Sequence, residues 1–150
     1  MTTVYDVPAE DLIDTVAKKL QKEDSIDLPE ANKYSRTGVS KENIPTDKDW
    51  WYKRCASILR KVYINEGIGV QRLRAEYGGK QDRGSKAYKA KAGAGSIVRR
   101  ALQQLEDAGY VKKIKGKGRV VTPKGRSFLD DISREIYEDL KENHPGLEKY

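Results

Sequence analysis

The chain has 150 residues and a net charge of +7, and 37% of its residues are hydrophobic. This length is enough for one domain with a hydrophobic core, and no apolar run approaches the roughly 18 residues of a membrane-spanning helix. The lone Cys55 and the lone His144 exclude an internal disulfide and argue against a metal site. We therefore expect one domain over residues 1–150, without cofactor or metal, in the reducing cytoplasm; the N-terminus also lacks a signal-peptide pattern.

The charge is sorted along the chain. Residues 50–126 hold 20 of the 30 basic side chains but only 5 of the 23 acidic ones, a local net charge of +15. The flanking segments, 1–49 and 127–150, each have a net charge of −4. A protein that only needed solubility would mix its signs. Because aromatic residues and glycines interleave with the cations, the middle region predicts a surface that binds phosphates, with a solvated lysine-rich face as the alternative.

Two elements are predicted before residue 49. Residues 9–24 have the spacing of an amphipathic helix that follows Pro8. Its apolar stripe consists of Leu12, Ile13, Val16, Ala17 and Leu20. Residues 25–46 have no clear period, so we expect an ordered loop with a short helical turn after Pro29.

A strong helix is predicted over about residues 49–65, with Asp47 and Asp49 as candidate N-caps. Its buried stripe is Trp51, Cys55, Ile58, Leu59, Val62 and Tyr63, in which the cysteine serves as core packing. A second, cationic stripe consists of Trp50, Arg54, Ser57 and Lys61. Trp50 is either a half-buried side chain or a flat π-face that stacks on a base or ribose beside Arg54, which would bind a phosphate.

A short helix is predicted over about residues 70–77. It places Val70, Leu73 and Tyr77 inward and Arg72 and Arg74 outward. The next stretch, residues 78–95, is rich in glycine and lysine and contains only one acidic residue, so it cannot build a core by itself. We expect a flexible basic loop here, because a loop of this length is usually functional or disordered.

The last third of the sequence predicts a helix, a hairpin and a second helix. Ser96 is a candidate cap for a helix over about 97–108 that presents Arg99, Arg100, Gln103 and Gln104 outward. Strands at 110–114 and 119–121 flank a glycine-rich turn. Thr122 and Pro123 are the N-cap and first residue of a helix over about 123–142, whose exposed face is acidic.

This order of elements is that of a mainly α, winged helix-turn-helix core with additional N- and C-terminal helices and a small β-hairpin wing. Fold alone does not identify the ligand. Signatures of an enzyme are missing from the sequence, which has neither a phosphate-binding Gly-x4-Gly-Lys-Ser/Thr loop nor paired carboxylates in the basic region. We therefore expect a binding protein rather than an enzyme.

Several strings of residues also resemble one known family. They are Asp49–Ser57 (DWWYKRCAS), Gly69-Val70, Tyr77–Gly79 (YGG), Arg83-Gly84, Gly95–Glu106 (GSIVRRALQQLE) and Gly118–Gly125 (GRVVTPKG). With them the chain closely resembles, over nearly its whole length, the "nineteen-e" family of small-subunit ribosomal proteins of archaea and eukaryotes. The sequence departs from the family at residues 85–89, where relatives often carry a Pro and a His.

The resemblance implies a winged-helix core bound to ribosomal RNA in the head of the small subunit, with a role in subunit assembly and rRNA maturation. It implies that Trp50, Arg54, Arg60 and Arg100 belong to a basic face that binds RNA. The candidate RNA-binding residues, from the residues and the resemblance together, are Trp50, Arg54, Arg60, Lys61, Lys80, Arg83, Lys86, Lys89, Arg99, Arg100, Lys115, Lys117 and Arg119. The expected partners are small-subunit ribosomal RNA and neighbouring ribosomal proteins, with no membrane and no small-molecule substrate.

The alternative is a winged-helix DNA-binding transcription regulator of the marR type. The segments 105–111 and 118–125 also look like the helix and wing of those repressors, although many winged domains share this pattern. Such regulators are generally dimers that bind two half-sites. Since no extra apolar stripe is left on the terminal helices and the basic stretch 78–95 has no clear use in a regulator, we favour the ribosomal interpretation and expect a monomer when the protein is free.

Overall fold

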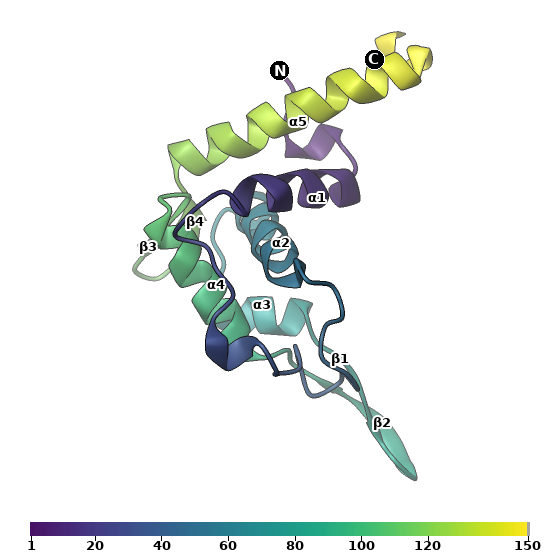
Figure 1. Ribbon diagram of the computed structural model, residues 1–150, viewed down its shortest axis with the longest axis vertical. Coiled ribbons are helices and arrows are strands. Elements are labelled where there is room, and N and C mark those ends of the chain that lie inside the picture. Colours follow the sequence, from purple (N-terminus) through teal and green to yellow (C-terminus); the bar gives the residue numbers. More distant parts are fainter. Residues whose placement is uncertain (150) are drawn as a thin grey trace.

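Residues 1–149, which the structure describes, form five α-helices and two separate antiparallel hairpins (Figure 1). This computed structural model confirms the expected mainly α fold with a small β wing. In chain order the elements are α1 (Ala9–Leu20), α2 (Trp50–Asn65), α3 (Val70–Glu76), β1 (Gly79–Arg83), β2 (Lys86–Lys91), α4 (Gly95–Asp107), β3 (Val111–Ile114), β4 (Gly118–Val121) and α5 (Pro123–Asn143). Short 3-10 helices cover Val4–Asp6, Glu30–Asn32 and Pro145–Lys149.

Helix α1 packs against both α2 and α5 (Figure 1). Its predicted stripe is buried, apart from Ile13, which is half-buried. The helix ends at Leu20, four residues earlier than predicted, because the chain turns there and the backbone N–H of Glu23 donates to the carbonyl of Leu20. The 3-10 helix at Glu30–Asn32 confirms the predicted turn after Pro29.

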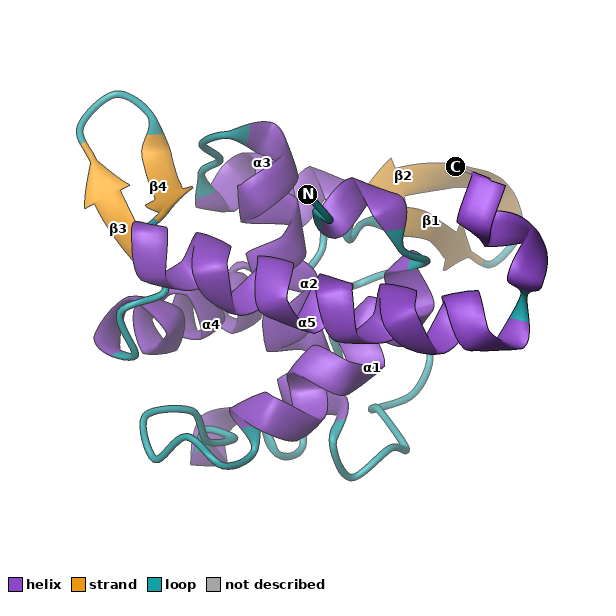
Figure 2. Ribbon diagram, turned by 90° about the horizontal axis from the view of Figure 1, so that it is seen from above, coloured by secondary structure: helices purple, strands orange, loops and turns teal. Residues whose placement is uncertain are grey.

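Helix α2 crosses the middle of the molecule, behind α5 in the view of Figure 2. All six residues of its predicted inner stripe are buried. Cys55 is among them, and burial raises the pKa of its thiol, as expected for core packing. The helix ends where Glu66 adopts a left-handed backbone with φ 55°.

Helices α3 and α4 pack against each other, and β3 and β4 form the wing that follows them. Ser96 does not cap α4, because the helix begins at Gly95 and its N-cap position is Ala94. Two of the four side chains expected to point outward from α4 are instead half-buried, namely Arg100 and Gln104. Gln104 accepts a hydrogen bond from Nε1 of Trp51 at 2.9 Å, so it anchors α4 to the core of α2.

The expected loop at residues 78–95 is mostly a two-stranded ribbon, which corrects the sequence-based interpretation. Strands β1 and β2 pair antiparallel, from Gly79 opposite Lys91 to Arg83 opposite Lys86. The ribbon extends away from the helices (Figure 1), and every residue of β2 is exposed. The backbone alone therefore makes the pairing, and the sequence has no alternation of apolar and polar residues that would predict these strands.

Helix α5 begins as predicted. Thr122 is its N-cap, and its hydroxyl accepts from the N–H of Gly125 at 3.1 Å and donates to the carbonyl of Gly109 at 2.6 Å. The ring of Phe128 stacks on Tyr110 with centroids 4.6 Å apart, which ties α5 to the start of the wing. Among residues 1–149, none of the helices is both long and apolar enough to span a membrane.

Candidate nucleic-acid interface

The outer face of α2 carries a cluster of Arg54, Ser57, Lys61 and Tyr77, which we call the Tyr77 cluster. The guanidinium carbon of Arg54 lies 4.0 Å from the ring centroid of Tyr77, and the Lys61 ammonium lies 5.1 Å from it. The hydroxyls of Ser57 and Tyr77 are 2.6 Å apart and share a hydrogen bond. The sequence placed three of these residues on one stripe, and the fold adds Tyr77 from the end of α3.

Charge within the Tyr77 cluster is unevenly compensated. The ammonium of Lys61 forms an ion pair with Glu76. Arg54 has no such partner among the described residues, and burial lowers the pKa of its guanidinium because desolvation disfavours the charged form. Burial also raises the pKa of the Tyr77 hydroxyl. Arg54 is therefore a half-buried cation supported mainly by an aromatic ring.

Two more predicted residues lie on α2. Trp50 is half-buried and packs edge-on against Trp51, with centroids 5.6 Å apart and planes at 90°. Arg60 is half-buried, and its Nε has no hydrogen-bond partner within residues 1–149. The half-buried alternative for Trp50 thus describes its position, and half-burial leaves part of the ring accessible.

Four of the predicted cations are exposed on the ribbon: Lys80, Arg83, Lys86 and Lys89. Of these four side chains, only that of Arg83 forms a hydrogen bond within the described part of the chain, from its Nε to the carbonyl of Ala87 at 2.9 Å. Tyr88, on the same ribbon, is an exposed aromatic that the candidate set missed. Its signal was an aromatic residue flanked by lysines in a stretch without a core.

Helix α4 separates its two arginines. Arg99 is exposed. Arg100 is half-buried and donates from its guanidinium to Oδ1 of Asn32 at 2.9 Å, a residue that is only 2% exposed. Arg100 therefore joins α4 to the loop before α2. Any contact of its guanidinium with RNA would have to form alongside this hydrogen bond.

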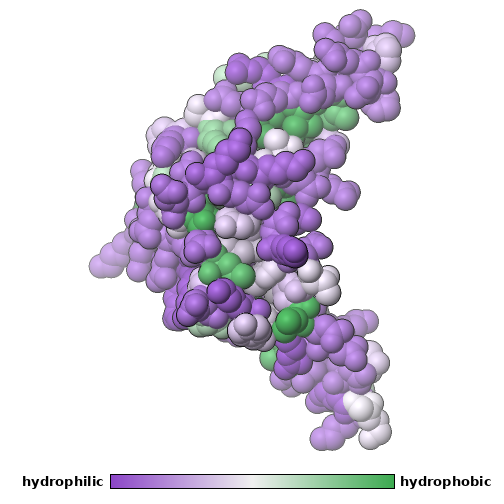
Figure 3. Space-filling model, viewed as in Figure 1, coloured by the Kyte–Doolittle hydropathy of each residue, from purple (hydrophilic) through white to green (hydrophobic). Residues whose placement is uncertain are grey.

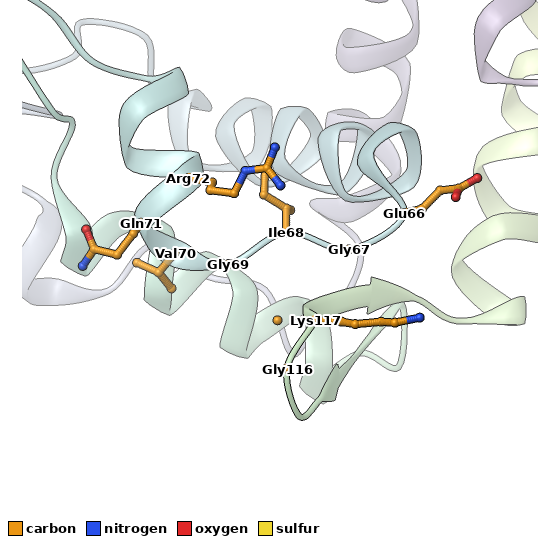
Figure 4. A pocket seen from close by; sticks show the side chains of 10 residues that line it. Glu66, Gly67, Ile68, Gly69, Val70, Gln71, Arg72, Gly116 and Lys117 are labelled. Carbon is orange, nitrogen blue, oxygen red and sulfur yellow. The ribbon is translucent and has the colours of Figure 1, made fainter.

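The wing tip forms one wall of a cleft of about 540 Å³, and the turn between α2 and α3 forms the other (Figure 4). Lys115 and Lys117 are exposed there, and the side chain of Lys117 runs along the wing. Arg119 is different, because its guanidinium turns toward Glu106 at 3.8 Å and its side chain is only 13% exposed. Its backbone also exchanges two hydrogen bonds of 3.0 Å with Ile68.

A group of acidic side chains on α5 lies away from the cations of the ribbon. Helix α5 lies at the opposite end of the molecule from the ribbon (Figure 1). Its residues Asp131, Glu135, Glu138 and Asp139 are exposed, whereas Asp130 is half-buried and accepts from the hydroxyl of Tyr63 at 2.9 Å. The charge that is sorted along the sequence is thus also sorted in space, with the ribbon at the cationic end.

Comparison with known proteins gives one family. The profile of the family described as Ribosomal protein S19e matches residues 3–139. A small ribosomal subunit protein eS19 from Thermoplasma acidophilum is 46% identical over 150 residues, covering 100% of this chain and 99% of that protein. Proteins of the same name from Aeropyrum pernix and Haloarcula marismortui are 47% and 43% identical, with the same coverage of both chains.

Proposed function

This chain belongs to the ribosomal protein S19e family, and we propose that it is a structural constituent of the small ribosomal subunit that binds ribosomal RNA. The names of its relatives describe proteins of the small ribosomal subunit. The family is a structural, non-enzymatic component of translation, and its relatives sit in the cytoplasmic ribosome. The resemblance further suggests a place in the subunit head and a role in assembly and rRNA maturation.

The observation that carries the RNA-binding proposal is the spatial separation of charge. Exposed cations lie on the ribbon, the wing tip and Arg99, while α5 presents carboxylates at the opposite end of the molecule from the ribbon (Figure 1). RNA offers phosphates, ribose hydroxyls and unstacked bases rather than a readable major groove. If about eight cations contact phosphates, the logarithm of affinity should fall against the logarithm of salt concentration with a slope on the order of −6 to −7.

The arrangement of the terminal helices favours this proposal over a marR-type regulator. Helices α1 and α5 pack on each other and on the core of the same chain, so their apolar faces are already covered. The face seen in Figure 3 is largely hydrophilic, with apolar atoms in small separate patches. We therefore propose that the free protein is a monomer, and that RNA and neighbouring ribosomal proteins are its partners.

The first test is sedimentation of a cell lysate through sucrose gradients at low and high salt, with detection of this protein in each fraction. We expect it to sediment with the small subunit and to leave only at high salt, because phosphate contacts weaken as salt rises. A dimer-sized species at the top of the gradient under low salt would overturn the ribosomal proposal and favour the regulator.

A further inference from the structure

A cavity of about 400 Å³ lies beside the Tyr77 cluster, between α2 and the loop that precedes it. Trp50 and Pro45 contribute apolar surface to its lining, and Arg54 and Tyr77 contribute a flat cation and an aromatic ring. The cavity is in the size range of small-molecule sites, which also combine apolar walls with a few polar groups. Its size and lining therefore suit one flat, partly polar group.

Arg54 is held in place before any ligand arrives. Its guanidinium carbon lies 4.0 Å from the Tyr77 ring centroid, and the Tyr77 hydroxyl is fixed by Ser57 at 2.6 Å. Since these contacts are made within the protein, little conformational entropy remains for a ligand to remove from this side chain. The face of the guanidinium that points away from Tyr77 is therefore already positioned for a ligand in the cavity.

Of the four other half-buried arginines in residues 1–149, three have polar partners, whereas the Nε of the fourth, Arg60, has none. Arg74 donates to the carbonyl of Gly93, Arg100 donates to Asn32, and Arg119 faces Glu106. In residues 1–149, Arg54 has neither a hydrogen bond nor an ion pair of this kind. A half-buried charge without such a partner is costly. Arg54 is therefore a candidate for a partner outside the chain.

We propose, on the basis of the RNA-binding function above, that this cavity takes one unstacked base of the small-subunit ribosomal RNA. The base stacks on the Arg54 guanidinium and packs against Trp50, as bases in single-stranded loops stack on arginine and aromatic planes. Asn43 and Asp47 line the same cavity and can form hydrogen bonds with the base edge. Lys41, exposed and also in the lining, can contact the phosphate of that nucleotide.

A base explains the lining better than a phosphate does. The cations Lys41, Lys53 and Arg54 of the lining could bind a phosphate, but the flat faces of Trp50, Pro45 and Tyr77 would add nothing to its binding. A base needs flat apolar and cationic surfaces, which these residues and Arg54 supply. The sequence alone assigned Arg54 to a phosphate, so the geometry changes its role to a stacking one.

The test measures binding of the full-length protein to a transcript of the small-subunit rRNA head, with chemical probing of each base. Arg54→Lys keeps the charge and removes the planar group, whereas Arg54→Gln removes the charge. We expect Arg54→Lys and Trp50→Leu each to weaken binding by about 5- to 150-fold, the range for stacking one base. Both should lose the protection of one unpaired base. Lys18→Gln on α1, which is exposed and outside the lining of the cavity, should bind as the unchanged protein does.

An abasic nucleotide at the protected position completes the test. It should weaken binding of the unchanged protein by the same factor, and Arg54→Lys should then cause no further loss. Normal binding by Arg54→Lys together with weak binding by Arg54→Gln would mean that Arg54 contacts a phosphate. That result would overturn the proposal that the cavity binds a base, but not the proposal that the protein binds RNA. If the unchanged protein does not bind the transcript or the subunit, the proposed function itself fails. Thermal unfolding by circular dichroism confirms that each variant is folded, and Arg54→Lys keeps the test decisive if Trp50→Leu is not.

Discussion

The β1–β2 ribbon and the β3–β4 wing are both short antiparallel hairpins rich in lysine and glycine, but they use these residues differently. In the wing, Val111 is buried, all of β4 is half-buried, and Arg119 exchanges two backbone hydrogen bonds with Ile68. In the ribbon, β2 is exposed along its whole length. The wing is thus packed on the folded core through its backbone and apolar residues, while its lysines on β3 and at the tip are exposed. The ribbon stabilises little of the fold, and its cations remain available for a ligand.

The sharpest test of this difference compares one glycine in each hairpin. Gly118 of the wing has φ +76°, and a Cβ there would lie 2.7 Å from the carbonyl oxygen of Ile68. Gly84 of the ribbon has φ +73°, but a Cβ there meets nothing within 4 Å among the described residues. We expect Gly118→Ala to lower the free energy of unfolding by about 2–5 kcal/mol, from backbone strain plus the overlap.

Gly84→Ala is the matched control, because it carries the same backbone strain without the overlap. We expect it to cost about 1–2 kcal/mol locally in the ribbon and to leave the global unfolding midpoint nearly unchanged. Urea denaturation followed by circular dichroism measures both. Equal losses of global stability in the two variants would show that the ribbon is coupled to the core after all.

The second test removes the ribbon's charge rather than its backbone. Replacing Lys80, Arg83, Lys86 and Lys89 by glutamine should leave thermal unfolding within a few degrees of the unchanged protein, because all four side chains are exposed. RNA binding should weaken, and the salt slope should shrink by about 3, since each lost phosphate contact removes about 0.7–0.9. The same change at Lys115 and Lys117 should shrink the slope by about half as much. An unchanged slope in the ribbon variant would remove the ribbon from the interface.

The third test extends the comparison to the two neighbouring arginines of α4. Arg100→Gln should lower the free energy of unfolding by about 1–3 kcal/mol, because the buried Oδ1 of Asn32 loses a charged donor. Arg99→Gln should leave stability within about 0.5 kcal/mol, because the side chain is exposed. Denaturant titrations of both variants check this, and a stable Arg100→Gln would show that its bond to Asn32 has little structural weight.

The smallest expected effect concerns the root of the wing at high pH. Burial and the hydrogen bond to Glu23, 2.8 Å long, raise the pKa of the Tyr110 hydroxyl above its ordinary value of 10.0. A raised pKa means that the folded state holds this proton more tightly, so stability is full below pH 10 and falls as the pH rises above it. Tyr110→Phe should cost about 1 kcal/mol at neutral pH and reduce the alkaline loss. Unfolding curves from pH 8 to 11 for both proteins measure this, and parallel losses would assign the effect to other tyrosines.

Much of the helical core was predictable from the sequence, because burial repeats with the period of a helix. The inner stripe of α2 and the N-cap at Thr122 are both where local patterns place them. The charge sorting was visible for the same reason, since it follows the order of residues along the chain. These features depend on residues that are close together in the sequence, so the pattern of a single sequence is enough to predict them.

Only the tertiary structure decided which polar residues serve the fold. Arg100, Gln104 and Arg119 look like free polar side chains in sequence, but their partners include Asn32 and Asp27, about 70 residues away. The ribbon could not be predicted from the sequence either, since its strands pair through the backbone alone. After β2, the chain forms an isolated β-bridge between Gly93 and Gly38, a contact between distant segments. The sequence placed three of the four residues of the Tyr77 cluster on one stripe. It did not show that the ring of Tyr77, at the end of α3, supports Arg54. Hydrogen bonds and stacking between distant segments depend on how the helices pack, and no local pattern encodes that geometry.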